Sequence, residues 1–331
     1  MGAGLTHRDH GGGIDAAVAR YGGQRADWLD LSTGINPVPY PVGDIPPEAW
    51  TALPDSAAME ALLAAARQFW GVPRKVAILA APGASSLIAR LPQTLGGPSS
   101  CMIQPHGYNE WVAAFGHYGW TITQHDLLRS VEIWVHPNNP DGVCAPGVPM
   151  DDPDSSPAAP RIIYDESFCD TVPRESHIAL TCNRRVFIVK SFGKFWGLAG
   201  LRLGFLIGDP AVLGDVAEAL GPWPVPGPAI AIGTRALSDP DWAKATRVRL
   251  VHDAARLDAI VPRYHGAVLG TSLFRLYTYR SQTLRDALFK HLARHRILTR
   301  VFPYSTTWMR IGLPAPHQWG RVAAAMAAFE P

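Results

Sequence analysis

Short, nearly continuous apolar runs alternate with helix-like segments through the first two thirds of this chain, and this alternation most constrains its fold. The strand-like runs lie at 76–80, 100–104, 132–136, 161–164, 186–189 and 204–207, and helix-like segments at 85–95 and 108–118. Strands that are apolar on both sides are typical of a parallel sheet with helices on both faces. The pattern therefore predicts an α/β fold with a mostly parallel central sheet between helices.

The 331 residues suffice for one large domain and a smaller one. The stretch GPWPVPGP at 221–228 contains four prolines, so it cannot form a helix interior, and we interpret it as the crossing between two domains. The segments after it predict a smaller α+β domain, with helices at 229–237, 241–261 and 283–295, a strand at 272–278, two more strands and a C-terminal helix. We expect an N-terminal arm at 1–40 that closes on the functional site, a large domain at 41–228 and a small domain at 229–331.

Two local features complete the outline. An amphipathic helix is predicted at 55–70, with Asp55 or Ser56 as its N-cap. The segment 145–160 is rich in Pro, Asp and Ser, which predicts a surface loop.

Composition excludes several classes of function. Hydrophobic residues make up 47% and charged residues 18%, as in ordinary globular proteins, and a net charge of +2 gives no reason to expect nucleic acid or an anionic membrane as partner. No apolar run approaches the ~20 residues that span a bilayer, and the polar, glycine-rich start lacks a signal-peptide core, so we expect a cytoplasmic protein. The four cysteines form no CxxC pair and the twelve histidines no HExxH motif, so neither a disulfide framework nor a metal site is expected.

The stretch SFGKFWGLAGLRLGF at 191–205 follows a strand and carries the most informative chemistry. Lys194 stands in a glycine-rich, aromatic-flanked turn, with Ser191 three residues before it and Arg202 eight residues after it. Partial burial of a lysine makes its neutral amine available, and neutral amines form imines with aldehydes. A hydroxyl and a guanidinium are the groups that a phosphate ester needs nearby. The alternative interpretation is a lysine in a surface loop.

Three other elements lie at strand ends. The turn APGASS offers free backbone N–H groups and Ser85 to a phosphate, although any strand-to-helix turn can carry Gly and Ser. In YDESF, a buried Asp165 carboxylate could keep a pyridine nitrogen protonated; its alternative is a helix cap or a loop charge. In HPNNPDG, the Asn139 amide can donate to a phenolate oxygen, and the alternative is a plain Pro/Asn/Gly turn.

The order and spacing of these four elements resemble the fold-type-I superfamily of pyridoxal 5′-phosphate (PLP) enzymes, and within it the class I/II aminotransferase group. The resemblance extends from about His10 to the C-terminus. It implies a PLP Schiff base on Lys194 and a catalytic Asp165 at the pyridine nitrogen. The other cofactor contacts that it implies are Asn139, Tyr108, Gly83, Ala84, Ser85, Ser191 and Arg202. It also implies a homodimer, because active sites in this superfamily lie at the subunit interface.

The chain departs from the family pattern at three positions. The ring that stacks on the cofactor usually belongs to a P-x-Y motif, and here PHGY has one extra residue before Tyr108. The tyrosine that many members place three residues after the aspartate is Phe168, which removes one donor to the cofactor phenolate. The tyrosine of a Y-P-D motif that reaches across the dimer to the cofactor phosphate is Leu53, which puts that contact in doubt.

Further stretches resemble one branch of the superfamily, the threonine-phosphate decarboxylases of cobalamin biosynthesis, which is itself close to histidinol-phosphate aminotransferase. These stretches are HGGG at 10–13, LDLSTGINP at 29–37, GPWPVPGP at 221–228 and WMRIGLP at 308–314. The resemblance implies decarboxylation of L-threonine O-3-phosphate to (R)-1-amino-2-propanol O-2-phosphate. The alternative is a PLP aminotransferase of the histidinol-phosphate type.

Both reactions require a substrate with an amino group and a remote phosphate. The resemblance implies that Arg310 binds the substrate carboxylate, that Arg300 contacts its phosphate, and that His10 with Gly34 and Ile35 closes over the same group. Surface arginines and an unstructured N-terminus are the alternatives. The orientation of the substrate Cα bonds decides between loss of CO2 and loss of a proton, and sequence leaves it open. A third hypothesis, a non-catalytic binding or regulatory member, predicts loss of the lysine or the aspartate, and both are present.

Overall fold

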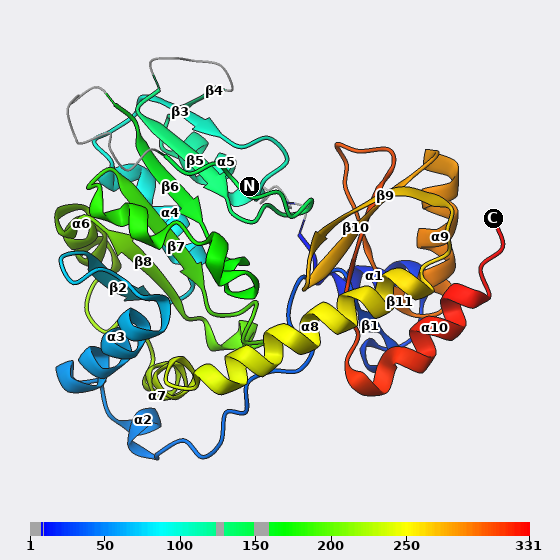
Figure 1. Cartoon of the computed structure of the whole chain (residues 1–331), viewed down its shortest axis with the longest axis horizontal. Helices are drawn as coiled ribbons and strands as arrows, with labels where there is room; N and C mark the ends of the chain where they lie inside the picture. Colours follow the sequence, from blue (N-terminus) through cyan, green and yellow to red (C-terminus); the bar gives the residue numbers. More distant parts are fainter. Residues whose placement is uncertain (1–7, 9, 124–128, 149–158) are drawn as a thin grey trace, which may run out of the picture. The chain divides into compact units, whose positions relative to one another are not determined.

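The computed structural model describes residues 8, 10–123, 129–148 and 159–331 (Figure 1). The chain divides into two compact units, of which the larger is Val38–Val251 and the smaller combines Met1–Pro37 with His252–Pro331. The boundary at 251 falls within one long helix, α8 (Pro240–Ile260). The expected domain ranges 1–40, 41–228 and 229–331 stay a prediction, and these units differ from them in grouping the N-terminal segment with the C-terminal residues.

The larger unit is built on a seven-stranded sheet with the strand order β2-β8-β7-β6-β5-β3-β4. Its strands are β2 (Ala77–Ala81), β3 (Ser100–Ile103), β4 (Thr121–Thr123), β5 (Val131–Val135), β6 (Arg161–Asp165), β7 (Val186–Ser191) and β8 (Gly204–Gly208). Only β8 is reversed, because it pairs antiparallel with both β2 and β7 while the other pairs are parallel. The predicted α/β class with a mostly parallel sheet is therefore confirmed.

Helices of the larger unit cover both faces of this sheet, because Trp70 packs on Phe205 while the next residue, Leu206, belongs to the core on the opposite face. They are α2 (Glu48–Thr51), α3 (Ser56–Trp70), α4 (Ala84–Thr94), α5 (Asn109–His117), α6 (Pro210–Leu220) and α7 (Gly227–Leu237). Apolar side chains of α4, α5 and α6 form one core with inward residues of the strands. Near-continuous apolar strands fold this way because helices on a parallel sheet exclude water from its faces.

The predicted local signals agree with the described structure. The Asp55 carboxylate accepts a hydrogen bond from the backbone N–H of Ala58 at 2.9 Å and caps α3. Helix α7 begins at Gly227, so the proline-rich stretch before it is irregular, and Pro228 stands in the first turn, where proline is tolerated. Of the predicted loop 145–160, residues 149–158 lie outside the described residues, and the flanking ones are irregular.

The smaller unit is α+β. A four-stranded antiparallel sheet has the order β12-β13-β10-β9, and β1 pairs parallel with β11. The strands are β1 (Leu29–Asp30), β9 (His265–Thr271), β10 (Phe274–Tyr279), β11 (Ile297–Leu298), β12 (Arg300–Val301) and β13 (Trp308–Gly312), and the helices are α1 (Ile14–Tyr21), α9 (Gln282–Arg294) and α10 (Trp319–Ala327). Among the described residues, no helix has the length and apolarity needed to cross a bilayer.

Candidate active site

A cavity lies in the larger unit, where the carboxyl ends of its parallel strands meet the start of β8. This is the edge at which open α/β sheets bind ligands. The cavity is lined by Ala84, Ser85, Ile88, Tyr108, Val135, Asn139, Asp165, Ser167, Phe168, Ser191, Lys194 and Arg202. The structure thus brings together every predicted cofactor contact except Gly83, which directly precedes the lining residue Ala84.

Lys194 lies in the loop that joins β7 to the reversed strand β8. The strand β7 ends at Ser191, which pairs with Gly204 at the start of β8. The lysine is half-buried, and its Nζ lies 5.8 Å from the ring centroid of Phe168. The amine therefore reaches the cavity wall rather than open solvent, and the surface-loop alternative does not describe this position.

Aromatic packing holds the backbone around this lysine. Trp196 is fully buried and stacks on Phe192, with ring centroids 5.1 Å apart and planes 8° apart. It stacks equally on Trp242 of α8, at 5.3 Å and 12°. Stacked rings of this size contribute both apolar burial and a defined geometry. The residues that flank Lys194 are thus anchored in the core, which leaves its side chain directed to the cavity.

An anion-binding cradle forms where α4 begins. Gly83 precedes this helix with a φ of +86°, and a Cβ placed on it would lie 2.7 Å from Nη2 of Arg202. A Cβ on Gly204 would lie 2.4 Å from the backbone N of Ala84, so β8 also approaches the helix start closely because it carries glycine there. A helix N-terminus beside a guanidinium is a binding site for a phosphate dianion. Only small residues leave room for that arrangement.

Asp165 ends β6 as a carboxylate that is only 2% exposed. Its Oδ2 accepts a hydrogen bond from Nε1 of Trp111 at 2.9 Å. Its Oδ1 accepts two from Ser167, at 2.5 Å from the hydroxyl and 3.1 Å from the backbone N–H. Burial raises the pKa of Asp165, while these bonds and the nearby charge of Lys194 act to lower it. The helix-cap alternative is not observed, because no described helix begins at this residue.

Sequence reasoning missed Trp111 and Ser167. A serine two residues after an aspartate is a recognisable pattern for a local side-chain bond, so Ser167 had a usable signal. Trp111 had none, because 54 residues separate it from Asp165 and only the packing of α5 against the sheet joins them.

Tyr108, the predicted stacking ring, lines the cavity at the start of α5. Burial raises the pKa of this phenol to about 12, helped by the charges of Glu110 and Asp165, whereas a hydrogen bond with Ser85 acts to lower it. The phenol is therefore neutral at physiological pH. Asn139 follows β5 in a tight turn, in which the N–H of Gly142 donates to the carbonyl of Asn138 at 2.8 Å.

The predicted substrate-binding residues belong to the smaller unit. Arg310 on β13 and Arg300 on β12 are direct cross-strand partners. Arg310 is 2% exposed, its Nη2 donates to the carbonyl of Ser32 at 2.5 Å, and its Cζ lies 5.0 Å from the ring of Phe274. The Cζ of Arg300 lies 5.0 Å from the ring of Phe302. The two guanidiniums are therefore held as a pair against aromatic rings.

The other predicted contacts lie on the N-terminal segment of the same unit. Gly34 is buried, Ile35 is half-buried and His10 is exposed. The N–H of Gly12 donates to the Ser32 hydroxyl at 2.7 Å, which places the glycine-rich start against the segment that follows β1.

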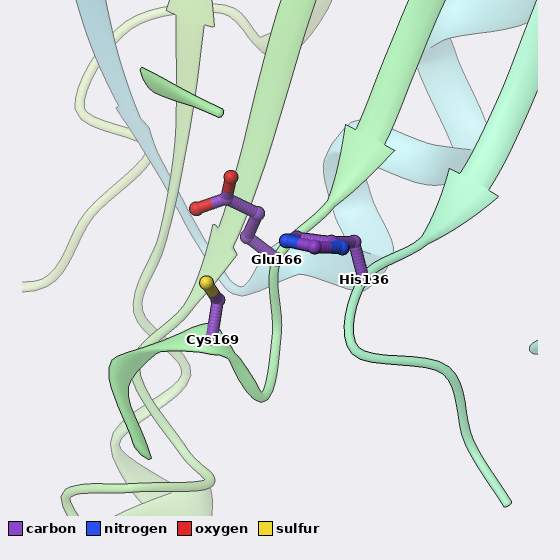
Figure 2. A group of neighbouring side chains, drawn as sticks. All are labelled: His136, Glu166 and Cys169. Carbon is purple, nitrogen blue, oxygen red and sulfur yellow. The ribbon is translucent and has the colours of Figure 1, made fainter. Parts of the chain in front are cut away.

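A buried polar cluster lies beside the cavity-forming strand ends (Figure 2). It contains His136, Glu166 and Cys169, whose potential ligand atoms lie within 4.8 Å of one another. Both ring nitrogens of His136 have backbone partners, since Nδ1 accepts from the N–H of Ala145 at 2.9 Å and Nε2 donates to the carbonyl of Glu175 at 2.6 Å. Burial raises the pKa of the Cys169 thiol, so it is protonated. A histidine with both ring nitrogens hydrogen-bonded and a protonated thiol fit a hydrogen-bonded core better than they fit a metal site.

A buried ion pair completes this cluster. Nζ of Lys190 lies 2.6 Å from Oε2 of Glu166 and 3.4 Å from Oδ1 of Asp170, and all three side chains are nearly inaccessible. The Glu166 carboxylate also accepts from the Ser176 hydroxyl at 2.7 Å and the His177 N–H at 2.6 Å. Directly after Asp165, the fold thus holds two buried carboxylates around one buried ammonium, and hydrogen bonds satisfy the remaining acceptors of Glu166.

Comparison with known proteins gives consistent results. The family described as "Aminotransferase class I and II" matches residues 120–329. A threonine-phosphate decarboxylase from Sinorhizobium sp is 38% identical over 97% of this chain and 98% of its own length, and one from Pseudomonas aeruginosa is 36% identical over 97% and 98%. A histidinol-phosphate aminotransferase from Desulfitobacterium hafniense is 26% identical over 70% of this chain and 71% of its own.

Solved structures show the same fold. The histidinol-phosphate aminotransferase of Sinorhizobium meliloti, in complex with pyridoxal-5′-phosphate, has a TM-score of 0.75 at 18% identity and covers 95% of this chain and 93% of its own. The L-threonine-O-3-phosphate decarboxylase of Porphyromonas gingivalis has a TM-score of 0.70 at 19% identity, with 90% and 98% covered. At these identities the likeness establishes architecture alone.

Proposed function

The chain belongs to the class I and II aminotransferase family, and from that membership we propose that it is a PLP-dependent enzyme that decarboxylates L-threonine O-3-phosphate to (R)-1-amino-2-propanol O-2-phosphate. The observation that carries the choice of reaction is the full-length similarity to threonine-phosphate decarboxylases. It is 36–38% over 97% of the chain, against 26% over 70% for the aminotransferase named above.

The cavity residues fit this cofactor. A phosphate matches the cradle at the start of α4, where a Cβ on Gly83 would occupy the space beside Arg202. Ala84, Ser85 and Ser191 line the cavity and supply donors from backbone and hydroxyl groups. Asp165, buried and held by donors, matches a protonated ring nitrogen. Asn139 and Tyr108 line the space between and suit the phenolate oxygen and the ring face.

When bound, PLP supplies an aldehyde that condenses with amines and a ring that accepts the electron pair left by CO2. Lys194 would hold the aldehyde carbon of the cofactor, and its amine, once released, would act as the general acid that protonates Cα. Asp165 keeps the proton at the ring nitrogen. Phe168, Val135 and Ile88 make part of the wall apolar, and electrostatic interactions are stronger beside such surfaces than in water.

We propose that Arg310 binds the substrate carboxylate and Arg300 the phosphate, with His10, Gly34 and Ile35 closing over that group. The cross-strand pairing of the two arginines supports this assignment, because paired guanidiniums recognise a compound with two anionic groups. A carboxylate held by an arginine is not thereby expelled, so the arginines contribute orientation rather than activation.

Product analysis tests the reaction type. The PLP-loaded protein should release CO2 and aminopropanol phosphate from L-threonine O-3-phosphate without any keto acid. Strict dependence on 2-oxoglutarate, with histidinol phosphate as amino donor, would instead establish the aminotransferase alternative. Lys194→Ala should lose the reaction, whereas Lys75→Ala, at an exposed lysine outside the cavity, should retain it.

We also propose that the protein is a homodimer. In the larger unit, Trp50 and Leu53 are 68% and 67% exposed, and Leu53 lines an apolar groove formed by α2, α3 and α7. Exposed apolar surface of this kind favours association. Sedimentation should show a dimer that Leu53→Glu weakens and that Val248→Glu, at a 56% exposed position on α8, leaves intact. The cytoplasmic location stays a prediction.

A further inference from the structure

The Asp165 carboxylate is surrounded by groups that donate. The indole Nε1–H of Trp111 donates to Oδ2, and the hydroxyl and N–H of Ser167 donate to Oδ1. The charge of Lys194 acts to lower the pKa of Asp165, and the charge of Asp165 in turn helps to raise the pKa of the Tyr108 phenol. The next carboxylate, Glu166, is engaged by Lys190 instead.

An indole can only donate, because its nitrogen has no available lone pair. A proton on Oδ2 directed at Trp111 would face another proton, so this contact exists only while Oδ2 acts as an acceptor. The Ser167 backbone N–H imposes the same condition on Oδ1, since it too can only donate. The donors on both oxygens therefore favour the ionised carboxylate and oppose burial, which by itself favours the neutral acid.

The indole is also held in place. Trp111 is fully buried in the core that α4 and α5 form with the sheet, and its ring packs against Phe115 at a centroid distance of 6.3 Å. Its N–H cannot swing away when the charge in the cavity changes. The fold thus holds the indole N–H directed at Oδ2.

We propose that Trp111, together with Ser167, is a positioning residue that keeps Asp165 ionised and aimed at the ring nitrogen of the cofactor. This inference rests on the proposed function, because it assumes that PLP occupies the cavity. Through Asp165 the indole governs whether the ring nitrogen is protonated, and hence how strongly the ring withdraws electrons.

The test uses the full chain loaded with PLP labelled with ¹⁵N in its ring, and it reads protonation of that nitrogen by NMR. Trp111→Phe keeps an aromatic ring and removes the donor. The matched control is Trp120→Phe, because Trp120 is also buried and its Nε1 donates to the Pro92 carbonyl at 3.1 Å. Trp111→Phe should move the ring-nitrogen signal toward the unprotonated form and weaken PLP affinity about tenfold. The control should leave the ring-nitrogen signal where it is in the wild type, and PLP affinity should change by less than about twofold.

A ring-nitrogen signal that is the same in wild type and Trp111→Phe would overturn the inference, while PLP binding by the wild type would leave the proposed function standing. A wild-type chain that binds no PLP would overturn both. If Trp111→Phe does not fold, Ser167→Ala tests the inference in its place. This variant removes only the hydroxyl donor and should shift the ring-nitrogen signal in the same direction by a smaller amount. An unshifted signal in Ser167→Ala would count against the inference.

Discussion

Removing the Lys190 ammonium should destabilise the fold far more than removing a surface charge. Lys190 lies 2.6 Å from Glu166 and 3.4 Å from Asp170, with side-chain exposures of 3%, 0% and 6%. Lys190→Met keeps the apolar stem and removes the ammonium that both buried carboxylates contact. Breaking a buried pair in this way costs about 3 to 5 kcal/mol. Because Glu166 keeps two further donors, we expect the lower end of that range.

Urea unfolding at constant m value measures this loss. The control is Arg25→Met, which removes a cation paired with Asp15 at 2.5 Å but on the surface, where the two side chains are 62% and 86% exposed. Such pairs contribute less than about 1 kcal/mol. Adding Glu166→Gln to Lys190→Met should restore part of the stability, because one stranded charge is gone. Equal losses in Lys190→Met and Arg25→Met would refute the claim that burial makes this pair important.

The same pair predicts an unusual pH response. Burial acts to raise the pKa of Glu166, but the Lys190 charge and the hydrogen bonds hold it below its usual value of 4.5. A lowered folded-state pKa contributes stability above pH 4.5, and this is lost as the pH falls through the folded-state value. Without the ammonium, burial raises the folded-state pKa of Glu166 instead. Lys190→Met should therefore gain stability as the pH falls, whereas the wild type should not. The stability gap between wild type and Lys190→Met should therefore narrow between pH 7 and pH 5, and a widening gap would contradict this account.

Two further predictions concern the cavity. Gly83→Ala and Gly97→Ala both place a Cβ at a positive φ, which costs each about 1 kcal/mol, but only the Cβ at Gly83 meets Arg202, at 2.7 Å from Nη2. Equilibrium dialysis should therefore show PLP affinity reduced about tenfold in Gly83→Ala and unchanged in Gly97→Ala; equal affinities would argue against the cradle. Lys194→Ala should lose the visible absorption band of the lysine-bound cofactor, and a band that persists would place the covalent link elsewhere.

The sheet of the larger unit could be predicted because its strands are short apolar runs with clear turn signals between them. The antiparallel direction of β8 could not be predicted, because an apolar run of residues is compatible with a parallel or an antiparallel strand. In the smaller unit, β9 was missed because three of its seven residues are exposed and two are glycines, so it shows no clear apolar alternation.

In the candidate site, too, some residues could be predicted from sequence and others could not. Lys194, Asp165 and Arg202 were found because each stands at a fixed spacing from a strand end, and the fold carries strand ends to one edge. The Lys190–Glu166 pair was not foreseen, because a lysine inside an apolar strand has no partner within its own segment. Trp111 was unpredictable for the same reason: its contact with Asp165 depends on tertiary packing.

The reversed strand β8 places the amine of Lys194 and the guanidinium of Arg202 on one hairpin loop, 192–203, between two paired strand ends. Both ends of that loop are pinned, by the pairing of Ser191 with Gly204 and by the contact of Gly204 with α4. A residue inserted or deleted between positions 194 and 202 would displace the Lys194 amine relative to the Arg202 guanidinium, the two groups proposed to hold the cofactor. Loop length here is thus under a constraint as strict as residue identity, although most loops of a protein this size tolerate such changes.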